Sequence, residues 1–277
     1  MFDRAFAKIN LSLDVFARRP DGYHELRSIM LPLNYYDELR IEKAEVMSYE
    51  CNVPYLNFDS SNTIVKAISL FKERYGISDN YKVVLNKLIP SQAGLAGGSA
   101  DGAAALRILF RMYGLKPKKA EIKELCLKIG ADVIFTYYNR PALVSGIGEE
   151  LAFFSIKEPL YVLLVKPARG ISTKEAYDNL NLDVCDHPDV YQLKERLIAG
   201  ADFADLLGNS LEEPSLRLCG AIRTLKEELQ ALGAERPLMS GSGSTVFVIS
   251  RKREEILTLY HKLSNSRYFV RYTEVKS

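Results

Sequence analysis

A glycine-rich segment at residues 90–105 carries the residues of this chain that are best suited to chemistry on an anion. Gly94, Gly97 and Gly98 lack the Cβ atoms that keep an anion from the backbone. Ser99, followed by small residues, fits the N-cap of a helix, whose first N–H groups and positive dipole end attract phosphate. The segment predicts a phosphate loop. Small residues also permit close helix packing, however, so the segment alone leaves both interpretations open.

The loop follows a predicted strand and differs from two common phosphate-binding motifs. No lysine follows Gly98, and the glycines lack the Gly-x-Gly-x-x-Gly spacing of a dinucleotide site. Residues 81–89 are apolar and β-branched, which is typical of a strand, and the helix after the loop is expected to end near Gly114. The segment therefore predicts a strand, a glycine loop and a helix.

Composition limits the partners that this chain can have. It has 277 residues, of which 47% are hydrophobic and 26% charged, and a formal net charge of +2. That length fits one large or two medium domains with substantial cores. The near-neutral charge disfavours nucleic acid and membrane surfaces as main partners, so we expect a small-molecule ligand.

The cysteines, histidines and apolar runs indicate a cytoplasmic protein. The 4 cysteines and 3 histidines are scattered and have neither the spacing of a disulfide framework nor that of a zinc site. No apolar signal core is present at the start, and the longest apolar run, residues 160–165, is far too short for a membrane span. We therefore expect reduced thiols and assign no metal-ligating residue.

The first element is a strand, because apolar and polar residues alternate over residues 5–16. One face is expected to join the core. The other presents Lys8, Asn10 and Ser12, which fits either a solvated surface or the polar wall of a cleft. The alternation alone favours the solvated surface.

Turn and helix signals follow in the first half of the chain. A turn at residues 18–22 precedes β-like segments at 26–33 and 38–41. Ser61 and Asn62 can cap a helix that ends at Gly76. A further helix is expected to end at Gly130, and Asp132 follows directly.

Beyond residue 150 the pattern restarts and predicts a second α+β domain. A second glycine cluster lies there at residues 239–247, where a tight turn without a ligand is the default interpretation. Two glycine clusters in two domains nevertheless fit a cleft enzyme. The strands are expected at residues 160–165, 246–250 and 268–275, and the helices at 173–180, 211–232 and 252–263.

Four motifs together resemble the galactokinase, homoserine kinase, mevalonate kinase and phosphomevalonate kinase (GHMP) superfamily over nearly the whole chain. They are Ala7-Lys-Ile-Asn10, the loop at residues 90–100, Gly130-Ala-Asp132 and Ser240-Gly-Ser-Gly243. Within that superfamily, Asp21-Gly-Tyr-His24 and Gly170-Ile-Ser-Thr173 with Tyr177 make the chain similar to the 4-diphosphocytidyl-2-C-methyl-D-erythritol kinases of the non-mevalonate isoprenoid pathway.

The resemblance implies an α+β, two-domain fold. Its N-terminal domain, expected at residues 1–153, binds ATP and resembles part of a ribosomal protein. Its C-terminal domain, expected at residues 154–277, is a ferredoxin-like α/β sandwich. Both halves agree with the pattern of strands and helices described above.

The resemblance also implies an ATP-dependent transfer to the 2-hydroxyl group of the methylerythritol moiety, with Mg²⁺ as the accompanying metal ion. Asp132 matches the family's catalytic carboxylate, and Lys8 matches the lysine that faces it across the transferred phosphoryl group. Asn62 and Lys66 fall where the family's adenine region begins, although an N-cap explains Asn62 nearly as well. The implied ATP-binding loop comprises Pro90, Ser91, Gln92, Ala93, Gly94, Leu95, Ala96, Gly97, Gly98, Ser99 and Ala100.

The implied substrate carries a cytidine diphosphate group. Tyr23 and Tyr177 match positions where the family places aromatic rings around the base, and His24 matches a residue that hydrogen-bonds the base edge. Asn10 and Thr173 match polar contacts to substrate. Without the resemblance, Tyr23 would be a packing residue of the turn and His24 a surface imidazole.

The chain departs from the family pattern at several positions. Ile134 stands where many relatives have proline, Ala100 where a second serine often follows, and Gln92 and Ala93 where some members have glycine. None of these changes removes a proposed catalytic group. The Mg²⁺ ligands are left undefined, with Ser99 as a candidate.

Two other functions remain open. Another small-alcohol kinase of the superfamily, acting on homoserine or mevalonate, shares the loop but is disfavoured by Tyr23, His24 and Tyr177. A catalytically silent nucleotide-binding regulator would be expected to lack Lys8 or Asp132, and both are present. The sequence does not determine the oligomeric state.

Overall fold

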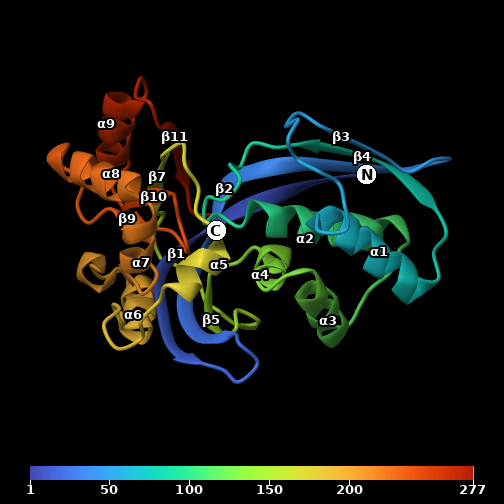
Figure 1. Cartoon of the computed structure of the whole chain (residues 1–277), viewed down its shortest axis with the longest axis horizontal. Coiled ribbons are helices and arrows are strands. Elements are labelled where there is room, and N and C mark those ends of the chain that lie inside the picture. The colour runs from blue at the N-terminus through green and yellow to red at the C-terminus, as the bar shows by residue number, and fades with distance from the viewer. Residues whose placement is uncertain (277) are drawn as a thin grey trace. The chain divides into compact units, whose positions relative to one another are not determined.

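The computed structural model describes residues 1–276, which form two compact units (Figure 1). Two long strands, β1 (Phe2–Arg18) and β2 (His24–Ala44), each contribute to both units. Unit 1 comprises Met1–Ala7, Tyr35–Pro90 and Ala96–Asn139. Unit 2 comprises Lys8–Asn34, Ser91–Leu95 and the described chain from Arg140 onward. The expected boundary between residues 153 and 154 stays a prediction.

Unit 1 contains a sheet in the order β3-β4-β2. β4 (Asn80–Asn86) runs antiparallel to β2, with Leu39 opposite Leu85, and parallel to β3 (Ser48–Cys51). Tyr81, Val83 and Leu85 of β4 are buried and alternate with more exposed residues, so one face of the strand joins the core.

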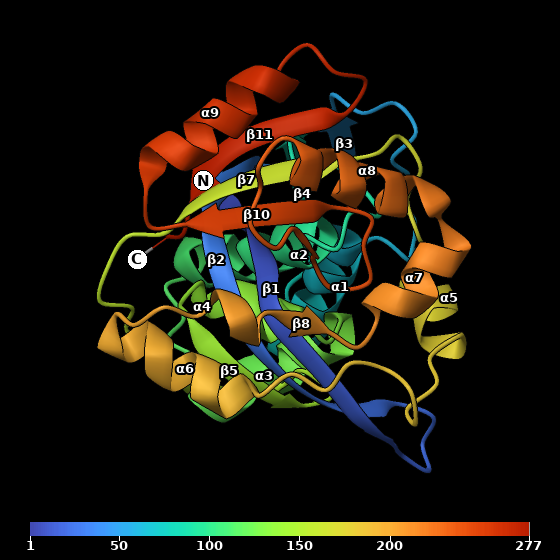
Figure 2. The same cartoon turned by 90° about the vertical axis from the view of Figure 1, so that its left-hand side faces the viewer.

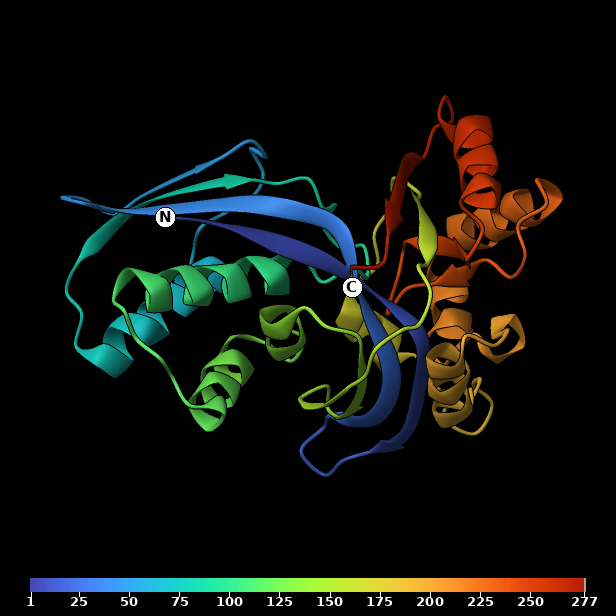
Figure 3. The same ribbon diagram turned by 180° about the vertical axis from the view of Figure 1, so that it is seen from behind.

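Helices lie on one side of this sheet, as Figures 1 and 3 show for α1 and α2. Asn62 caps α1, and Gly76 ends it with a φ of 65°, as the sequence predicts. Four buried alanines of α2 allow its neighbours to approach closely, and a Cβ at Gly102 would lie 3.0 Å from Cβ of Thr63. The helices of unit 1 are α1 (Thr63–Tyr75), α2 (Gly97–Met112), α3 (Lys119–Ile129) and α4 (Val133–Tyr138).

Unit 2 contains the remaining parts of β1 and β2 and extends them with short strands. β5 (Ala142–Gly146) pairs antiparallel with β2, so that Ser28 lies opposite Val144, and β6 (Glu150–Phe153) pairs with β5. β8 (Gly208–Asn209) pairs in parallel with β1 at Ser12 and Leu13.

The second sheet of unit 2 is antiparallel, in the order β11-β7-β10-β9. β7 is buried from Val162 to Lys166, and α8 and α9 cover one face of the sheet (Figure 2). The strands are β7 (Tyr161–Lys166), β9 (Leu238–Met239), β10 (Val246–Ser250) and β11 (Phe269–Glu274). The helices are α5 (Thr173–Asp178), α6 (Val190–Ala199), the 3-10 turn η1 (Ala204–Leu206), α7 (Glu212–Leu218), α8 (Gly220–Ala231) and α9 (Arg253–Leu263).

The α+β prediction is confirmed, with some differences in individual elements. The segments expected at residues 26–33 and 38–41 are one continuous strand, β2, and the helix expected at 211–232 is divided at Cys219 into α7 and α8. Helices α4 and α6 were not expected from the sequence. α4 has only 6 residues, whereas α6 has Val190, Leu193 and Leu197 buried at helical spacing, so its pattern was visible in the sequence. Within residues 1–276, no helix has the length and apolar character that a membrane span needs.

A buried ion cluster joins β2, β4 and α2 in unit 1. The Lys87 ammonium contacts Asp37 and lies 2.9 Å from Asp101 Oδ2, and Asp37 Oδ1 also accepts from the backbone N–H of Leu88 and Ile89. Burial raises the pKa of Asp101 to about 8 despite the opposing attraction of Lys87. Burial also opposes the charge on Lys87, but Asp101 and Asp37 outweigh it and raise its pKa. The cluster therefore fixes the end of the strand that leads into the glycine loop.

Lys87→Met is expected to destabilise the fold by about 3–5 kcal/mol, because it leaves two buried carboxyl groups without their cation. Lys82→Met is the matched control on β4, since Lys82 pairs with Glu50 at 2.7 Å on the surface and its loss should cost about 0–1 kcal/mol. Urea unfolding of both variants measures the two free energies. Equal losses would show that the buried cluster does not stabilise unit 1.

Candidate functional site

Three motifs that lie far apart in the sequence meet at the entrance of the glycine loop within unit 2. The backbone N–H of Lys8 donates to the carbonyl oxygen of Leu95 at 3.1 Å. The Ser240 hydroxyl donates to the Gly94 carbonyl at 3.0 Å and accepts from the Asn10 N–H at 3.3 Å. β1 and the second glycine cluster therefore hold the loop entrance from two sides.

Two glycines with positive φ lie in this close packing. Gly94 has a φ of 71°, and a Cβ there would lie only 1.9 Å from the carbonyl oxygen of Ser240. A Cβ on Gly241 would lie 3.1 Å from Asn10 Oδ1 and 3.4 Å from Lys8 Nζ. Glycine at position 94 thus allows the loop to pack closely against the segment that contains Ser240.

The polar face of β1 is buried. Lys8, Asn10 and Ser12 are at most 4% exposed, so the expectation of a solvated face is wrong. The Lys8 ammonium donates to Asn10 Oδ1 at 2.5 Å, and Asn10 Nδ2 donates to the Ser28 hydroxyl at 2.8 Å. Buried polar groups therefore form hydrogen bonds with Lys8 and Asn10 on this face.

The start of α2 in unit 1 leaves backbone donors for an anion. Ala96, rather than Ser99, occupies the N-cap, in the left-handed region with a φ of 55°, and its side chain makes no capping hydrogen bond. The first helical bond runs from Ala100 N–H to Ala96, so the N–H groups of residues 97–99 precede it. The sequence-based assignment of Ser99 failed because the loop turns one residue before Gly97.

The glycines at the start of α2 differ in their surroundings. A Cβ on Gly97 would lie 2.8 Å from Lys87 Nζ, so packing requires that glycine. Gly98 is exposed, and a Cβ there would meet only Thr63 Oγ1, at 3.9 Å. Gly98 is the position of the loop at which a ligand can approach the backbone. Close packing therefore accounts for Gly94 and Gly97, whereas phosphate binding at Gly98 stays a prediction.

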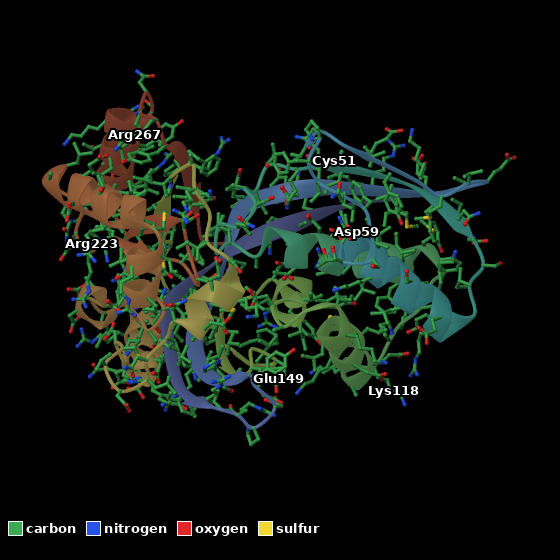
Figure 4. All side chains as sticks on the ribbon, viewed as in Figure 1. Cys51, Asp59, Lys118, Glu149, Arg223 and Arg267 are labelled. Atoms are coloured by element: carbon green, nitrogen blue, oxygen red, sulfur yellow. The ribbon has the colours of Figure 1, made fainter. Side chains whose placement is uncertain are left out.

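The start of α1 lies beside the start of α2 in unit 1. The Thr63 hydroxyl donates to the Gly98 carbonyl at 2.5 Å. Asn62 Oδ1 caps α1 by accepting from Ile64 N–H, and half-buried Lys66 lies in the same first turns. The loop between Cys51 and Asp59 leads into this helix (Figure 4). Thr63 was missed because its contact with Gly98 is not local in the sequence.

Asp132 lies directly before α4 in unit 1. The residue is half-buried, and its backbone carbonyl accepts from the Thr136 hydroxyl at 3.1 Å, which anchors the first turn of the helix. Lys8 belongs to unit 2 and Asp132 to unit 1. Their pairing across a phosphoryl group stays a prediction.

The residues predicted to recognise a base gather in unit 2. The rings of His24 and Tyr177 lie 5.1 Å apart at an angle of 32°. Burial, helped by Arg18 and opposed by Asp178, lowers the pKa of His24 and favours a neutral imidazole. Tyr23 is 58% exposed next to this pair. The structure thus brings His24 and Tyr177 together and leaves much of the Tyr23 ring accessible.

Thr173 connects the start of α5 with the second glycine cluster. Its hydroxyl lies 3.0 Å from the hydroxyl of Ser242, and the carbonyl of Ser242 accepts from Ser215. At the other end of the cluster, the Ser244 hydroxyl donates to the Arg169 carbonyl. The cluster at residues 239–247 therefore organises two neighbouring segments of unit 2 as well as the loop entrance.

Comparison with known proteins identifies the family. Residues 62–140 match the family model described as GHMP kinases N terminal domain, and residues 192–268 match the one described as GHMP kinases C terminal. A 4-diphosphocytidyl-2-C-methyl-D-erythritol kinase of Bacillus licheniformis is 38% identical over 274 residues, covering 95% of this chain and 92% of the relative. The chain belongs to the 4-diphosphocytidyl-2-C-methyl-D-erythritol kinase family.

Further comparisons agree with this family. A relative so named from Clostridium botulinum is 41% identical over 248 residues, covering 88% of this chain and 89% of the relative. The crystal structure of a 4-(cytidine 5'-diphospho)-2C-methyl-D-erythritol kinase superposes with a TM-score of 0.82 at 30% identity, with full coverage of both chains. The GHMP kinase fold and the assignment to a kinase family are confirmed.

A homoserine kinase of Cytophaga hutchinsonii shares the fold alone. Its TM-score is 0.71 at 17% identity, over 98% of this chain and 94% of the homoserine kinase. The superfamily fold is therefore common to kinases with different substrates. The differences in substrate between these kinase families must therefore come from particular side chains and not from the fold.

The backbone N–H groups and side-chain oxygens of this chain determine whether ATP and a metal ion can bind. The uncapped start of α2 and the open position at Gly98 fit a phosphate group of ATP, the nucleotide of GHMP kinases. In residues 1–276, no group of three or more His, Cys, Asp or Glu side chains could hold a metal ion. Mg²⁺ that accompanies nucleotide phosphates commonly uses only one or two protein carboxylates, so the donor set is compatible with it.

Gly94→Ala is expected to impair the loop far more than a glycine change elsewhere, because the new Cβ would overlap Ser240 and adopt a strained φ. We expect a loss of several kcal/mol in unfolding free energy, or a raised KM for ATP. Gly114→Ala is the control: its φ is 63°, but nothing lies within 4 Å of its Cβ, so only about 1 kcal/mol should be lost. Urea unfolding and ATP titration of both variants measure the difference, and similar behaviour would contradict the packing role of Gly94.

Proposed function

We propose that this chain transfers the γ-phosphoryl group of ATP to the 2-hydroxyl group of 4-diphosphocytidyl-2-C-methyl-D-erythritol, in the non-mevalonate route to isoprenoid precursors. One observation supports the proposal most directly. The backbone of Lys8 bonds to Leu95, so a buried ammonium group lies on the strand that holds the entrance of the phosphate loop. Its family relatives carry the name of this kinase.

The loop and the start of α2 are proposed to bind the ATP phosphates. The N–H groups of residues 97–99 and the helix dipole would favour negative charge there, and Gly98 allows close approach. Asn62 and Lys66 at the start of α1 are proposed to contact the nucleotide next to the loop. Mg²⁺ bound with ATP would add charge neutralisation, and Ser99 in the first turn of α2 is the candidate to contact it.

Lys8 and Asp132 are proposed as the catalytic pair. Phosphoryl transfer passes through a loose, highly charged transition state, so alignment and charge neutralisation supply most of the rate. The Lys8 ammonium would stabilise the charge on the transferred group and keep the Asp132 carboxyl ionised. Asp132 would orient the acceptor hydroxyl and accept its proton as the new P–O bond forms, without complete deprotonation beforehand.

Cytidine recognition is proposed for the aromatic group in unit 2. Tyr23 and Tyr177 would stack on the base, and the neutral imidazole of His24 would hydrogen-bond its edge. Stacking holds any base, whereas the histidine contact selects among them. Asn10 and Thr173 are proposed to make polar contacts to the remainder of the substrate.

Two alternatives are less well supported. A homoserine or mevalonate kinase would share the fold but has no need for the paired rings of His24 and Tyr177. A silent regulator would not need a buried ammonium group beside the loop. We also propose a cytoplasmic location, because the free cysteines Cys51, Cys126, Cys185 and Cys219 fit a reducing compartment.

ADP release measured side by side with three alcohols tests the proposal. With Mg-ATP, wild type is expected to turn over 4-diphosphocytidyl-2-C-methyl-D-erythritol selectively, and mevalonate and homoserine poorly. Asp132→Asn should lower kcat by about 10²-fold or more, because the amide cannot accept the proton. Glu124→Gln is the control, since this carboxylate is exposed on α3 and pairs with its helix neighbour Lys128 at 2.8 Å.

Equal or better turnover of homoserine or mevalonate would reject the proposed substrate. Undiminished turnover by Asp132→Asn would reject the proposed base. A protein that binds ATP and releases no ADP with any of the three alcohols would favour the regulator.

A further inference from the structure

A directional chain of hydrogen bonds lies behind Lys8 inside unit 2. The Lys8 ammonium donates to Asn10 Oδ1 at 2.5 Å, and Asn10 Nδ2 donates to the Ser28 hydroxyl at 2.8 Å. The Ser28 hydroxyl donates in turn to the backbone carbonyl of Ser12 at 2.6 Å. Each of these groups is buried, and Ser28 has no exposed surface. Water therefore cannot readily replace any member of the chain.

The Ser28 hydroxyl determines the direction of the hydrogen bonds in this series. A hydroxyl has one proton, and that of Ser28 is given to the Ser12 carbonyl, so toward Asn10 the Ser28 oxygen can only accept. The Asn10 amide must then turn its NH₂ group toward Ser28 and its oxygen toward Lys8. In the flipped orientation, the NH₂ group would face the Lys8 ammonium, donor against donor.

We propose that Ser28 is a positioning residue for the Lys8 ammonium and acts through the Asn10 amide. The inference rests on the proposed catalytic role of Lys8. Ser28 lies on β2. β2 pairs with β5, with Ser28 opposite Val144, and this pairing fixes the strand. The Ser28 hydroxyl thus links the position of the Lys8 ammonium to a rigid sheet. Phosphoryl transfer needs such precise placement, because small misplacements of a charged group slow the reaction.

Ser12, a neighbouring buried serine, allows the positioning role of Ser28 to be distinguished from a packing role. The Ser12 hydroxyl is also buried, but within residues 1–276 its oxygen has no hydrogen-bond partner. The Ser28 bond goes to the backbone carbonyl of Ser12, which Ser12→Ala retains. Ser12→Ala and Ser28→Ala therefore remove the same group from adjacent buried positions, and only the second breaks the chain to Lys8.

The test is a double-mutant cycle measured by ADP release with Mg-ATP and the alcohol that wild type accepts. Ser28→Ala is expected to lower kcat roughly tenfold or more, with the KM for ATP changed less than about twofold, because the loop is untouched. Ser12→Ala should stay near wild type, and Ser28→Thr, which keeps the hydroxyl, should recover most of the rate. In a Lys8→Met background, Ser28→Ala should cause no further loss, because its effect passes through Lys8.

Two results would overturn the inference. One is a kcat for Ser28→Ala that equals that of Ser12→Ala. The other is the same loss from Ser28→Ala with and without Lys8, which would indicate a packing role only. Should Ser28→Ala fail to fold, Ser28→Cys replaces it, because the thiol fills the site but is a weak hydrogen-bonding group. If wild type accepts a different alcohol, the proposed substrate fails, while the same cycle on that alcohol still decides the role of Ser28.

Discussion

Burial of the Lys8 ammonium on the polar face of β1 is the constraint on which the rest of unit 2 depends. A cation withdrawn from water is costly unless hydrogen bonds surround it, and here the Asn10 amide oxygen supplies one at 2.5 Å. That requirement explains why a strand near the start of the chain carries polar groups on its inner face. The same strand is bonded to a segment more than two hundred residues away, because the Asn10 N–H donates to the Ser240 hydroxyl.

A second buried ammonium, that of Lys87, has a structural role that differs from the catalytic role proposed for Lys8. Lys87 contacts the carboxyl groups of Asp37 and Asp101, and these contacts fix the strand before the loop. One hydrogen bond of Lys8 goes to the neutral amide of Asn10, in a series of hydrogen bonds that ends on the backbone carbonyl of Ser12. The contacts of Lys87 stabilise unit 1, whereas the bond to Asn10 orients the Lys8 ammonium, which suits the role in phosphoryl transfer proposed for it.

Much of the fold follows from local signals, because alternation and capping residues act over a few positions. The strand at residues 5–16 and the helix between Asn62 and Gly76 were predictable in this way. Burial of the β1 polar face was not, since the residues that cover it come from distant segments. The N-cap at Ala96 was missed because the loop holds this residue at a φ of 55°, against the preference of its side chain. Ser28 and Thr63 are single polar residues whose contacts exist only in the folded chain.

The Lys8 ammonium is proposed to act in the phosphoryl-transfer step. A single-turnover measurement of ADP formation, with enzyme in excess over 4-diphosphocytidyl-2-C-methyl-D-erythritol and with saturating Mg-ATP, isolates that step from product release. Lys8→Met is expected to slow the transfer by about 10²-fold or more while ATP binding stays nearly unchanged. A transfer rate within about twofold of wild type would contradict the account.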